Sequence, residues 1–431
     1  MFFPVYLYLA ALLLAALLST RLMKVANLPN VTGYIITGII MGPFVLGLFF
    51  NGFTFEGIKA GVINTYVNDI GWVSTVALGF IAFSIGSSFK VNTLRKVGKK
   101  VIVITIFESL FASVCVILSM LVLHFIMPNI VTIEMALVLG AIASATAPAA
   151  TLMVIKQYNA RGDFVDTLLP VVALDDASAL ILFSLLFQIA TAISGGGSFS
   201  LYRMLVKPIV EIVLSIVFGA VAGTLISFIN RFFKSRNNKL ILCIFSIFLS
   251  LGLYYLFKNP AMGEFELSSL LMCMVAGTIY TNIAKDSGKT FDLMERFTSP
   301  VYMMFFVLAG ASLDLTIFTS KLGIILIAVA SVYIVFRVVG KWAGSYTGAV
   351  ITKADEKIRK YLGIALIPQA GVAIGLANNA KLLFSSVPET AEIGNTILAI
   401  ILTTTLVYEL VGPFAAKFAL TKAGAIENIK H

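Results

Sequence analysis

The chain has 431 residues, of which 59% are hydrophobic and 12% charged, and its mean hydropathy is +0.99. A water-soluble chain carries roughly twice that share of charge, so the composition excludes a soluble enzyme or a soluble binding domain. The net charge of +10 does not indicate a nucleic-acid partner either, because the basic residues gather in alternate loops between apolar segments.

Apolar segments of about 18 residues or more recur along the whole chain, which is the pattern of an all-α, polytopic membrane protein. The sequence predicts about thirteen spans, whose ends are uncertain by roughly 2–4 residues. In chain order they are 2–19, 31–50, 69–89, 101–126, 132–155, 165–193, 204–229, 239–257, 266–284, 298–316, 322–346, 360–380 and 394–416.

Lysine and arginine lie mainly in the loops on one side of these spans, and this bias assigns that side to the cytoplasm. The largest groups are the runs 90–100, 231–239 and 353–360. We therefore expect a multi-pass protein of the cell membrane, with its N-terminus outside and its C-terminus in the cytoplasm. Because the loops are short, we expect residues 1–431 to form a single transmembrane unit with no soluble regulatory domain.

Short motifs recur in the two halves of the chain at nearly equal offsets. "FSIGSSFK" ends the third span and "VLAGASLD" ends the tenth, and this match aligns Gly86 with Gly310. The fifth and twelfth spans align in the same way. Alternating spans give the matched segments opposite directions, which is the pattern of inverted repeats in secondary transporters. We predict repeat one over 1–193, a linker helix over 204–229 and repeat two over 239–417.

The fifth and twelfth spans also contain residues that interrupt helices. Proline removes a backbone donor and frees a carbonyl one turn earlier, and inside a membrane such groups must be paired or line a wet cavity. We predict two interrupted helices at corresponding places in the halves, although kinked structural helices would give the same local pattern. The residues concerned are Ser144, Thr146, Pro148 and Thr151 in "SATAPAAT" and Pro368, Gln369 and Gly371 in "IPQAGVAIG".

The sixth span contains two adjacent acids, Asp175 and Asp176, in "VVALDDASALILFS". They lie about 15 Å along a helix in a hydrocarbon core about 30 Å thick, where each costs about 2.5–3.5 kcal/mol and marks an ion or proton pathway by default. Like charge and burial both favour protonation of one member, so a proton and a cation compete for the pair. Hard cations prefer oxygen ligands, and we expect help from the hydroxyls of Ser144 and Thr146 and from unwound carbonyls of the fifth span. An acid pair held only by interhelical hydrogen bonds is the structural alternative.

The remaining charges within spans are predicted to be structural, with Glu108 as the accessory candidate. Arg337 and Lys341 are predicted to lie near the inner end of the eleventh span and to extend toward the membrane surface. Glu211 is predicted to be a packing residue, whereas Glu409, like Gln369, is either a packing residue or part of the pathway. The cysteines and histidines show no metal-ligand spacing, so we expect no fixed metal site and no cofactor.

These segments resemble the monovalent cation:proton antiporter superfamily. "ALDDASALILFSL" looks like its paired-aspartate helix, "ASATAPAATLMV" and "LIPQAGVAIGLA" resemble its two interrupted helices, and "GYIITGIIMGPFVLG" and "FFVLAGASLDL" are similar to further signatures. The resemblance implies a homodimer of thirteen-helix protomers, with dimerisation and core subdomains interleaved in sequence and the interrupted helices crossing in the core. It places ion and proton binding at Asp176, with Asp175 as partner and with Ser144, Thr146 and the backbone around Pro148 as helpers.

We therefore expect a secondary transporter, not an enzyme, that exchanges a monovalent cation (Na⁺ first, K⁺ or Li⁺ as alternatives) for protons by alternating access and serves pH homeostasis. Paired-aspartate members commonly carry a basic residue in the tenth span that pairs with the first aspartate, and "TSPVYMMFFVLAGASLDL" has none. This absence bears on the number of protons moved per cation. A cation-coupled symporter of a small organic solute is the alternative function, and a non-transporting receptor is a third class.

Overall fold

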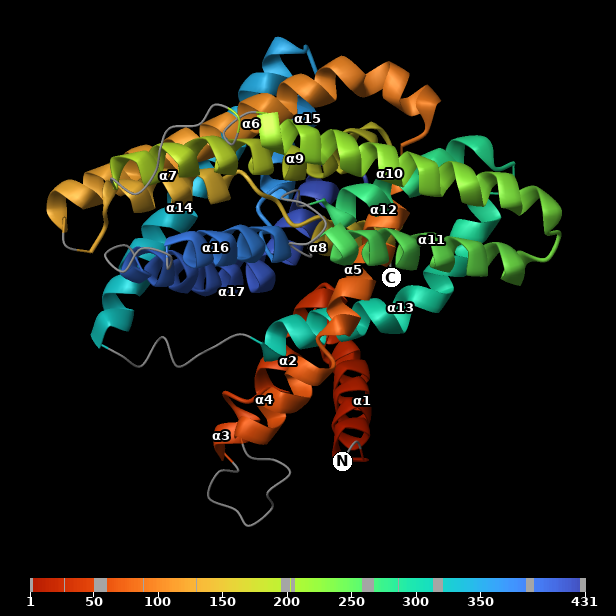
Figure 1. Cartoon of the computed structure of the whole chain (residues 1–431), viewed down its shortest axis with the longest axis horizontal. Coiled ribbons are helices and arrows are strands. Elements are labelled where there is room, and N and C mark those ends of the chain that lie inside the picture. The colour runs from red at the N-terminus through yellow and green to blue at the C-terminus, as the bar shows by residue number, and fades with distance from the viewer. Residues whose placement is uncertain are drawn as a thin grey trace. The chain divides into compact units, whose positions relative to one another are not determined.

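The computed structural model describes residues 3–26, 28–49, 60–87, 89–128, 130–194, 202, 206–257, 267–285, 287–312, 321–384 and 391–426. Every regular element in these ranges is a helix (Figure 1). Within them, nine helices or broken helix pairs are long and apolar enough to cross a membrane, and shorter apolar helices cover 30–41 and 269–283. The all-α, polytopic prediction is confirmed, while thirteen as the number of crossings stays a prediction.

The chain divides into two compact units, and each is built from two stretches of sequence. Unit 1 comprises 1–96 and 209–313, and unit 2 comprises 97–208 and 314–431. The helices of unit 1 are α1 (Phe3–Val25), α2 (Asn30–Met41), α3 (Leu46–Phe49), α4 (Ala60–Asp69), α5 (Trp72–Gly86), α10 (Lys207–Ile229), α11 (Arg236–Phe257), α12 (Ser269–Ile283) and α13 (Ser287–Ala311). Those of unit 2 are α6 (Val91–Ile126), α7 (Ile133–Ala143), α8 (Pro148–Gln157), α9 (Asp163–Ile193), α14 (Lys321–Ile351), α15 (Glu356–Ala365), α16 (Gly371–Phe384) and α17 (Ala391–Lys422).

Unit 1 is held by helix pairs that approach each other at glycine. In the pair α2 and α13, a Cβ added to Gly38 would overlap the backbone carbonyl of Val307, and one added to Gly310 would overlap the carbonyl of Ile35. Small residues let helix backbones come this close, so that packing replaces the hydrophobic effect that lipid does not supply.

The helices α5 and α12 approach each other at glycine in the same way. A Cβ added to Gly277 would overlap the carbonyl of Phe83, and one added to Gly86 would overlap the carbonyl of Met274. Gly86 and Gly310, which the predicted repeats align with each other, therefore both lie at such close helix contacts. The repeat itself and its inversion in the membrane stay predictions.

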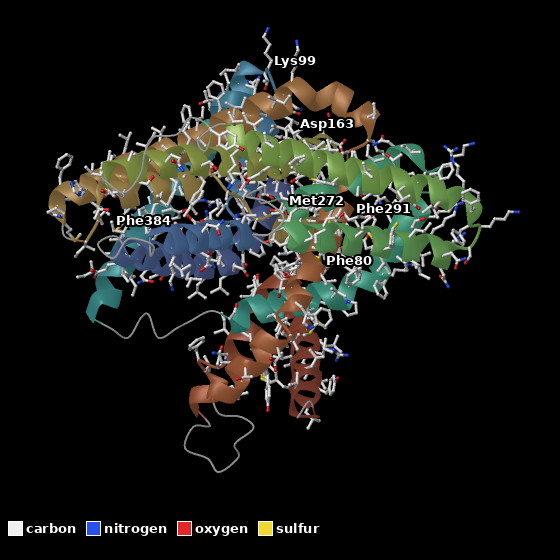
Figure 2. All side chains as sticks on the ribbon, viewed as in Figure 1. Phe80, Lys99, Asp163, Met272, Phe291 and Phe384 are labelled. Carbon is white, nitrogen blue, oxygen red and sulfur yellow. The ribbon has the colours of Figure 1, made fainter. Side chains whose placement is uncertain are left out.

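The interior of unit 1 around these pairs is apolar. Phe80 of α5 and Met272 of α12, both labelled in Figure 2, are 2% and 0% exposed. The ring of Phe83 lies 5.5 Å from that of Phe291 on α13. Aromatic and aliphatic side chains thus fill the space between helices whose backbones meet at glycine.

In unit 2, α14 packs closely on α6 through three glycines spaced one turn apart. Gly340, Gly344 and Gly348 lie against residues 111–112, 107–108 and 103–104 of α6, respectively. The numbers rise on one helix and fall on the other, so the two helices run antiparallel. This contact brings the side chains of the middle of α14 next to those of α6, which positions the candidate site.

Candidate functional site

Both predicted interruptions are confirmed. α7 ends at Ala143 and α8 begins at Pro148, while α15 ends at Ala365 and α16 begins at Gly371. Pro148 occupies the first turn of α8, where its missing N–H would have no helical partner in any case. The chain between each pair of helices is extended or turned, so its polar backbone groups need partners from elsewhere.

The two interrupted segments bind each other directly. The backbone N–H of Ala147 donates to the carbonyl of Pro368 at 2.8 Å. The hydroxyl of Thr146 donates to the carbonyl of Leu366 at 3.4 Å, and that of Thr151 donates to the carbonyl of Ala365 at 3.3 Å. The breaks in the fifth and twelfth spans therefore meet at one place.

Arg337 of α14 joins the two segments a second time. Its guanidinium donates to the carbonyls of Ala143 at 2.9 Å, Ala145 at 2.6 Å and Ile367 at 2.7 Å. It also lies 4.6 Å from the ring centre of Tyr408 on α17. A buried guanidinium is stable only when its donors are used, and here carbonyls at the C-terminal ends of two helices, where the macrodipole is negative, use them.

Gln369 closes the same junction from the other side. Its amide nitrogen donates to the carbonyl of Ile142 at 2.9 Å and lies 3.1 Å from the hydroxyl of Tyr333 on α14. Gln369 is 1% exposed and Tyr333 is fully buried. The predicted crossing residue Gln369 thus adds a second donor to the carbonyl of Ile142, which also accepts from the backbone N–H of Ala145 at 3.2 Å, next to the break in the fifth span.

Asp175 is fully buried beside this junction. Its Oδ1 accepts a hydrogen bond from Ser109 of α6 at 2.7 Å, and the Ser178 hydroxyl lies 3.3 Å from the same oxygen. The hydroxyls of Ser109 and Ser178 are 2.6 Å apart. One carboxylate oxygen is therefore held by two serines.

Lys341 of α14 binds the other oxygen of Asp175 and links it to three further groups. Its ammonium donates to Asp175 Oδ2 at 2.7 Å and to the hydroxyl of Thr146 at 2.9 Å, and it contacts the carbonyl of Ser144. It also forms an ion pair of 2.6 Å with Glu108 Oε2, and both side chains are fully buried. One ammonium is thus shared between two carboxylates and the break in the fifth span.

Asp176 differs from its neighbour in lacking such partners. Its Oδ1 is buried and has no hydrogen-bond partner among the residues that the structure describes. Adjacent residues of a helix point about 100° apart, which explains why Asp175 reaches Lys341 and Asp176 does not. With Lys341 charged, three ionised carboxyl groups would leave net negative charge in a buried place, and a bound proton or monovalent cation reduces it.

The prediction that Arg337 and Lys341 extend to the membrane surface is wrong, because both side chains are 0% exposed. The expected eleventh span ended at residue 346, whereas α14 continues to Ile351, so both residues lie farther from the end of the helix than the sequence suggested. The tenth span has no basic residue to pair with the first aspartate. Asp175 nevertheless has a basic partner, Lys341, which belongs to the eleventh span.

The structure also refines the helpers expected from the fifth span. The Ser144 hydroxyl donates to the carbonyl of Ala141 in its own turn at 2.7 Å, so its backbone carbonyl is the group that reaches the site. Thr146 reaches the site through its hydroxyl, and Glu108 joins it as the accessory candidate. The carbonyls expected as cation ligands are already hydrogen-bonded to Arg337, Lys341 or Gln369.

Sequence reasoning missed four side chains of this site: Ser109, Ser178, Arg337 and Lys341. A signal existed for the last two, because basic residues four apart share a helix face and "FRVVGKW" places them in an otherwise apolar helix. For the two serines no signal existed, since small hydroxyl residues are common in membrane helices.

Comparison with known families matches nearly the whole chain. The family model described as "Sodium/hydrogen exchanger, transmembrane" matches residues 9–417. No curated protein sequence matches the chain.

Two solved structures of the sodium proton antiporter MjNhaP1 from Methanocaldococcus jannaschii are similar to this fold. The structure at pH 8 gives a TM-score of 0.67 at 17% identity and covers 97% of this chain and 99% of its own. The one from an electron-microscopy map gives a TM-score of 0.72 at 17% identity and covers 98% of both chains. At this identity the likeness establishes the fold.

Proposed function

The chain belongs to the sodium/hydrogen exchanger family and is a multi-pass membrane transporter that exchanges cations for protons, and we propose that Asp176 is the group at which they compete. The observation that carries this proposal is the buried Oδ1 of Asp176, which has no partner in the described part of the chain, next to an Asp175 whose two oxygens are both bound. A buried carboxylate without a partner is unstable, so Asp176 binds either a proton or a cation.

The competing cation is proposed to be Na⁺, with K⁺ and Li⁺ as alternatives. A hard monovalent cation takes oxygen ligands, and the carboxylates of Asp176 and Asp175 supply them. To bind Asp175 the cation has to weaken the contact between Asp175 and Lys341, since both compete for the same oxygens. Thr146 and Ser144 act through Lys341, because both accept its hydrogen bonds.

Glu108 is proposed to keep Lys341 charged while the cation is bound. A lysine that lost its only carboxylate partner in a dry place would tend to release its proton. Here the ion pair with Glu108 remains when Asp175 turns to the cation. Exchange then involves the proton of Asp176 alone, one proton for one monovalent cation, and moves no net charge.

The remaining proposals concern the whole molecule. We place the interrupted-helix crossing, and therefore the transport core, in unit 2, and we assign dimerisation to unit 1 of a homodimer in the cell membrane. The N-terminus is proposed to lie outside and the C-terminus in the cytoplasm. Alternating access would let the site face each side in turn, and the exchange would serve pH homeostasis.

The test uses proteoliposomes with an imposed pH gradient and a trapped pH-sensitive dye. Na⁺, K⁺ and Li⁺ are added in turn to wild type, to Asp176→Asn, and to Asp163→Asn, a matched control on the exposed first turn of the same helix (labelled in Figure 2). We expect cation-dependent collapse of the gradient in wild type and Asp163→Asn and its loss in Asp176→Asn. The ranking of the ions names the substrate.

Three outcomes would contradict the proposal or a part of it. If folded, inserted wild type responds to no cation at any pH, exchange at this site is rejected and a symporter of an organic solute is tested next. If Asp176→Asn keeps the wild-type rate, the competition lies at another group. A rate that rises when the membrane potential is clamped to zero would contradict one-to-one exchange, because only net charge movement is opposed by a potential.

A further inference from the structure

A further pair of buried polar side chains, Thr405 and Glu409, lies on α17 in unit 2. Thr405 is 1% exposed and Glu409 is 7% exposed. Within the described ranges, Thr405 Oγ1 and Glu409 Oε2 are both buried atoms without a hydrogen-bond partner. The two residues are four apart, so their side chains are neighbours on one helix face.

The other threonines of α17 show that this is a departure from the local rule. Each of them donates its hydroxyl to a backbone carbonyl three or four residues earlier, at 2.8 to 3.0 Å: Thr396, Thr403, Thr404 and Thr421. This back-bonding is the usual way for a helical threonine to satisfy its hydroxyl. Thr405 is the exception, and its hydroxyl is left for a group beside the helix.

The face that contains Thr405 and Glu409 lies against the interrupted twelfth span. Gly412 is seven residues after Thr405 and shares its face, and a Cβ added to Gly412 would come within 3.0 Å of Pro368. Tyr408, the residue before Glu409, donates to the carbonyl of Ile334 on α14 at 3.3 Å. Glu409 therefore belongs to the same compact unit as the crossing.

No neighbouring charge neutralises Glu409 in the part of the chain that the structure describes. On the helices packed against α17, the charged side chains that the structure describes are Arg337 and Lys341 on α14, Glu356 and the basic stretch 357–360 on α15, Lys156 on α8, Glu134 on α7 and Lys381 on α16. α17 itself carries Glu392, Lys417 and Lys422 toward its two ends. None of the ion pairs found among the described residues joins one of them to Glu409. Arg337, beside Tyr408, has its donors on three carbonyls.

We propose that Glu409 is a second proton-binding site of the protein, which holds its proton as a carboxylic acid and exchanges it through the hydroxyl of Thr405. Ionisation of an unpaired buried carboxyl is opposed by the loss of hydration, whereas the neutral acid needs only one acceptor for its O–H. A hydroxyl one turn away can both accept and donate, which suits it to pass a proton.

A proton fits this pair better than a metal cation does. Hard cations are bound by several oxygens, and this pair offers one carboxyl and one hydroxyl. The proposal does not depend on Asp176 being the exchange site, because it concerns another helix and another ligand.

The test is an infrared titration of wild type, Glu409→Gln and Glu356→Gln in liposomes. Glu356 is an exposed glutamate on α15 whose side chain is 72% exposed, which makes it a matched control. We expect a protonated-carboxyl band in wild type and in Glu356→Gln that is lost in Glu409→Gln and is unchanged by Na⁺, K⁺ or Li⁺. Asp176→Asn should keep this band, which separates it from the proposed exchange site.

A second variant tests the hydroxyl. Thr405→Val keeps the shape of the side chain, so the band should remain, but its shift after transfer to deuterated water should be several-fold slower than in wild type. Identical spectra for Glu409→Gln and wild type would overturn the proposal, and so would loss of the band on addition of a cation, which would make Glu409 a cation ligand. Exchange at the wild-type rate in Thr405→Val would remove Thr405 from the path.

Discussion

Units 1 and 2 differ in what they add to close helix packing. In both units backbones meet at glycine, as Gly310 against Ile35 in unit 1 and Gly344 against Phe107 in unit 2 show. In unit 2, in addition, two helices are broken and charged side chains fill the junction. Of the six buried charged side chains in the described ranges, Lys239 belongs to unit 1, and Glu108, Asp175, Arg337, Lys341 and Glu409 belong to unit 2.

The difference shows that the free-energy cost of burying charged side chains falls mainly in unit 2. Close packing at glycine adds stability and leaves no group to titrate. A buried ion network adds little net stability compared with apolar packing, and in a membrane such groups mark ion pathways. Unit 2 therefore retains costly groups that a purely structural bundle would replace, and the contrast predicts which changes each unit tolerates.

The largest expected effect is from Lys341→Ala. The change leaves the carboxylates of Glu108 and Asp175 buried without a counter-ion, and breaking a buried pair in this way costs about 3–5 kcal/mol. We expect a large fall in the thermal midpoint of the purified protein, measured by the loss of folded protein on heating in detergent. The double variant Lys341→Met with Glu108→Gln should recover part of the loss, because one unpaired charge is removed together with the ammonium. A single variant as stable as wild type would show that Lys341 does not hold the network together.

The glycine contacts of unit 1 give the next effect. Gly310→Ala places a Cβ against the carbonyl of Ile35, and forcing extra volume into such a contact costs about 1–3 kcal/mol. Gly252→Ala in α11 is the matched control, since a Cβ there meets nothing within 4 Å, and alanine is favoured over glycine in a helix by up to about 1 kcal/mol. The two variants should shift the thermal midpoint in opposite directions. Equal shifts would mean that close approach at Gly310 is not what stabilises the pair.

The smallest effect is expected at an exposed ion pair outside the breaks. Lys360 Nζ lies 2.5 Å from Glu356 Oε1, and this hydrogen bond holds the pKa of Glu356 below its usual value. The pair contributes at neutral pH, and the contribution is lost as the pH falls through that lowered pKa. Because water and salt screen it, Glu356→Gln should barely move the thermal midpoint, and high salt should abolish even that difference. A salt-independent loss would indicate a further role for Glu356.

Much of the architecture follows from the sequence. Hydropathy locates the spans, and Pro148 and Pro368 locate the breaks, because both signals arise from a residue's own chemistry or that of near neighbours. The acids in α9 stand out for the same reason. Asp175 and Asp176 could thus be selected as candidates without a structure, whereas their different environments could not be predicted.

Tertiary pairing is the part that local signals do not contain. Lys341 and Asp175 are 166 residues apart in the chain, and they meet only because α9 and α14 fold together. The glycine contact of α14 with α6 likewise brings Lys341 next to Glu108. A single sequence gives no measure of that distance. The expected helix end at 346 also led to the prediction that Arg337 lies near the membrane surface. An error of five residues in a helix end amounts to more than one helical turn.

The eight carbonyls from residues 142 to 145 and from 365 to 368 each accept a hydrogen bond from a protein donor: Gln369, Arg337, Lys341, Thr151, Thr146 or the backbone of Ala147. In potassium-selective pores, rings of backbone carbonyls replace the hydration shell of the ion. At this junction the carbonyls are bound to protein donors instead, so under the proposed mechanism the ion preference comes from the carboxylates. Anionic oxygens attract a small alkali ion more strongly than a large one, and the same carboxylates also bind the proton. Discrimination between alkali ions and sensitivity to pH would then both follow from the electrostatic field of these carboxylates.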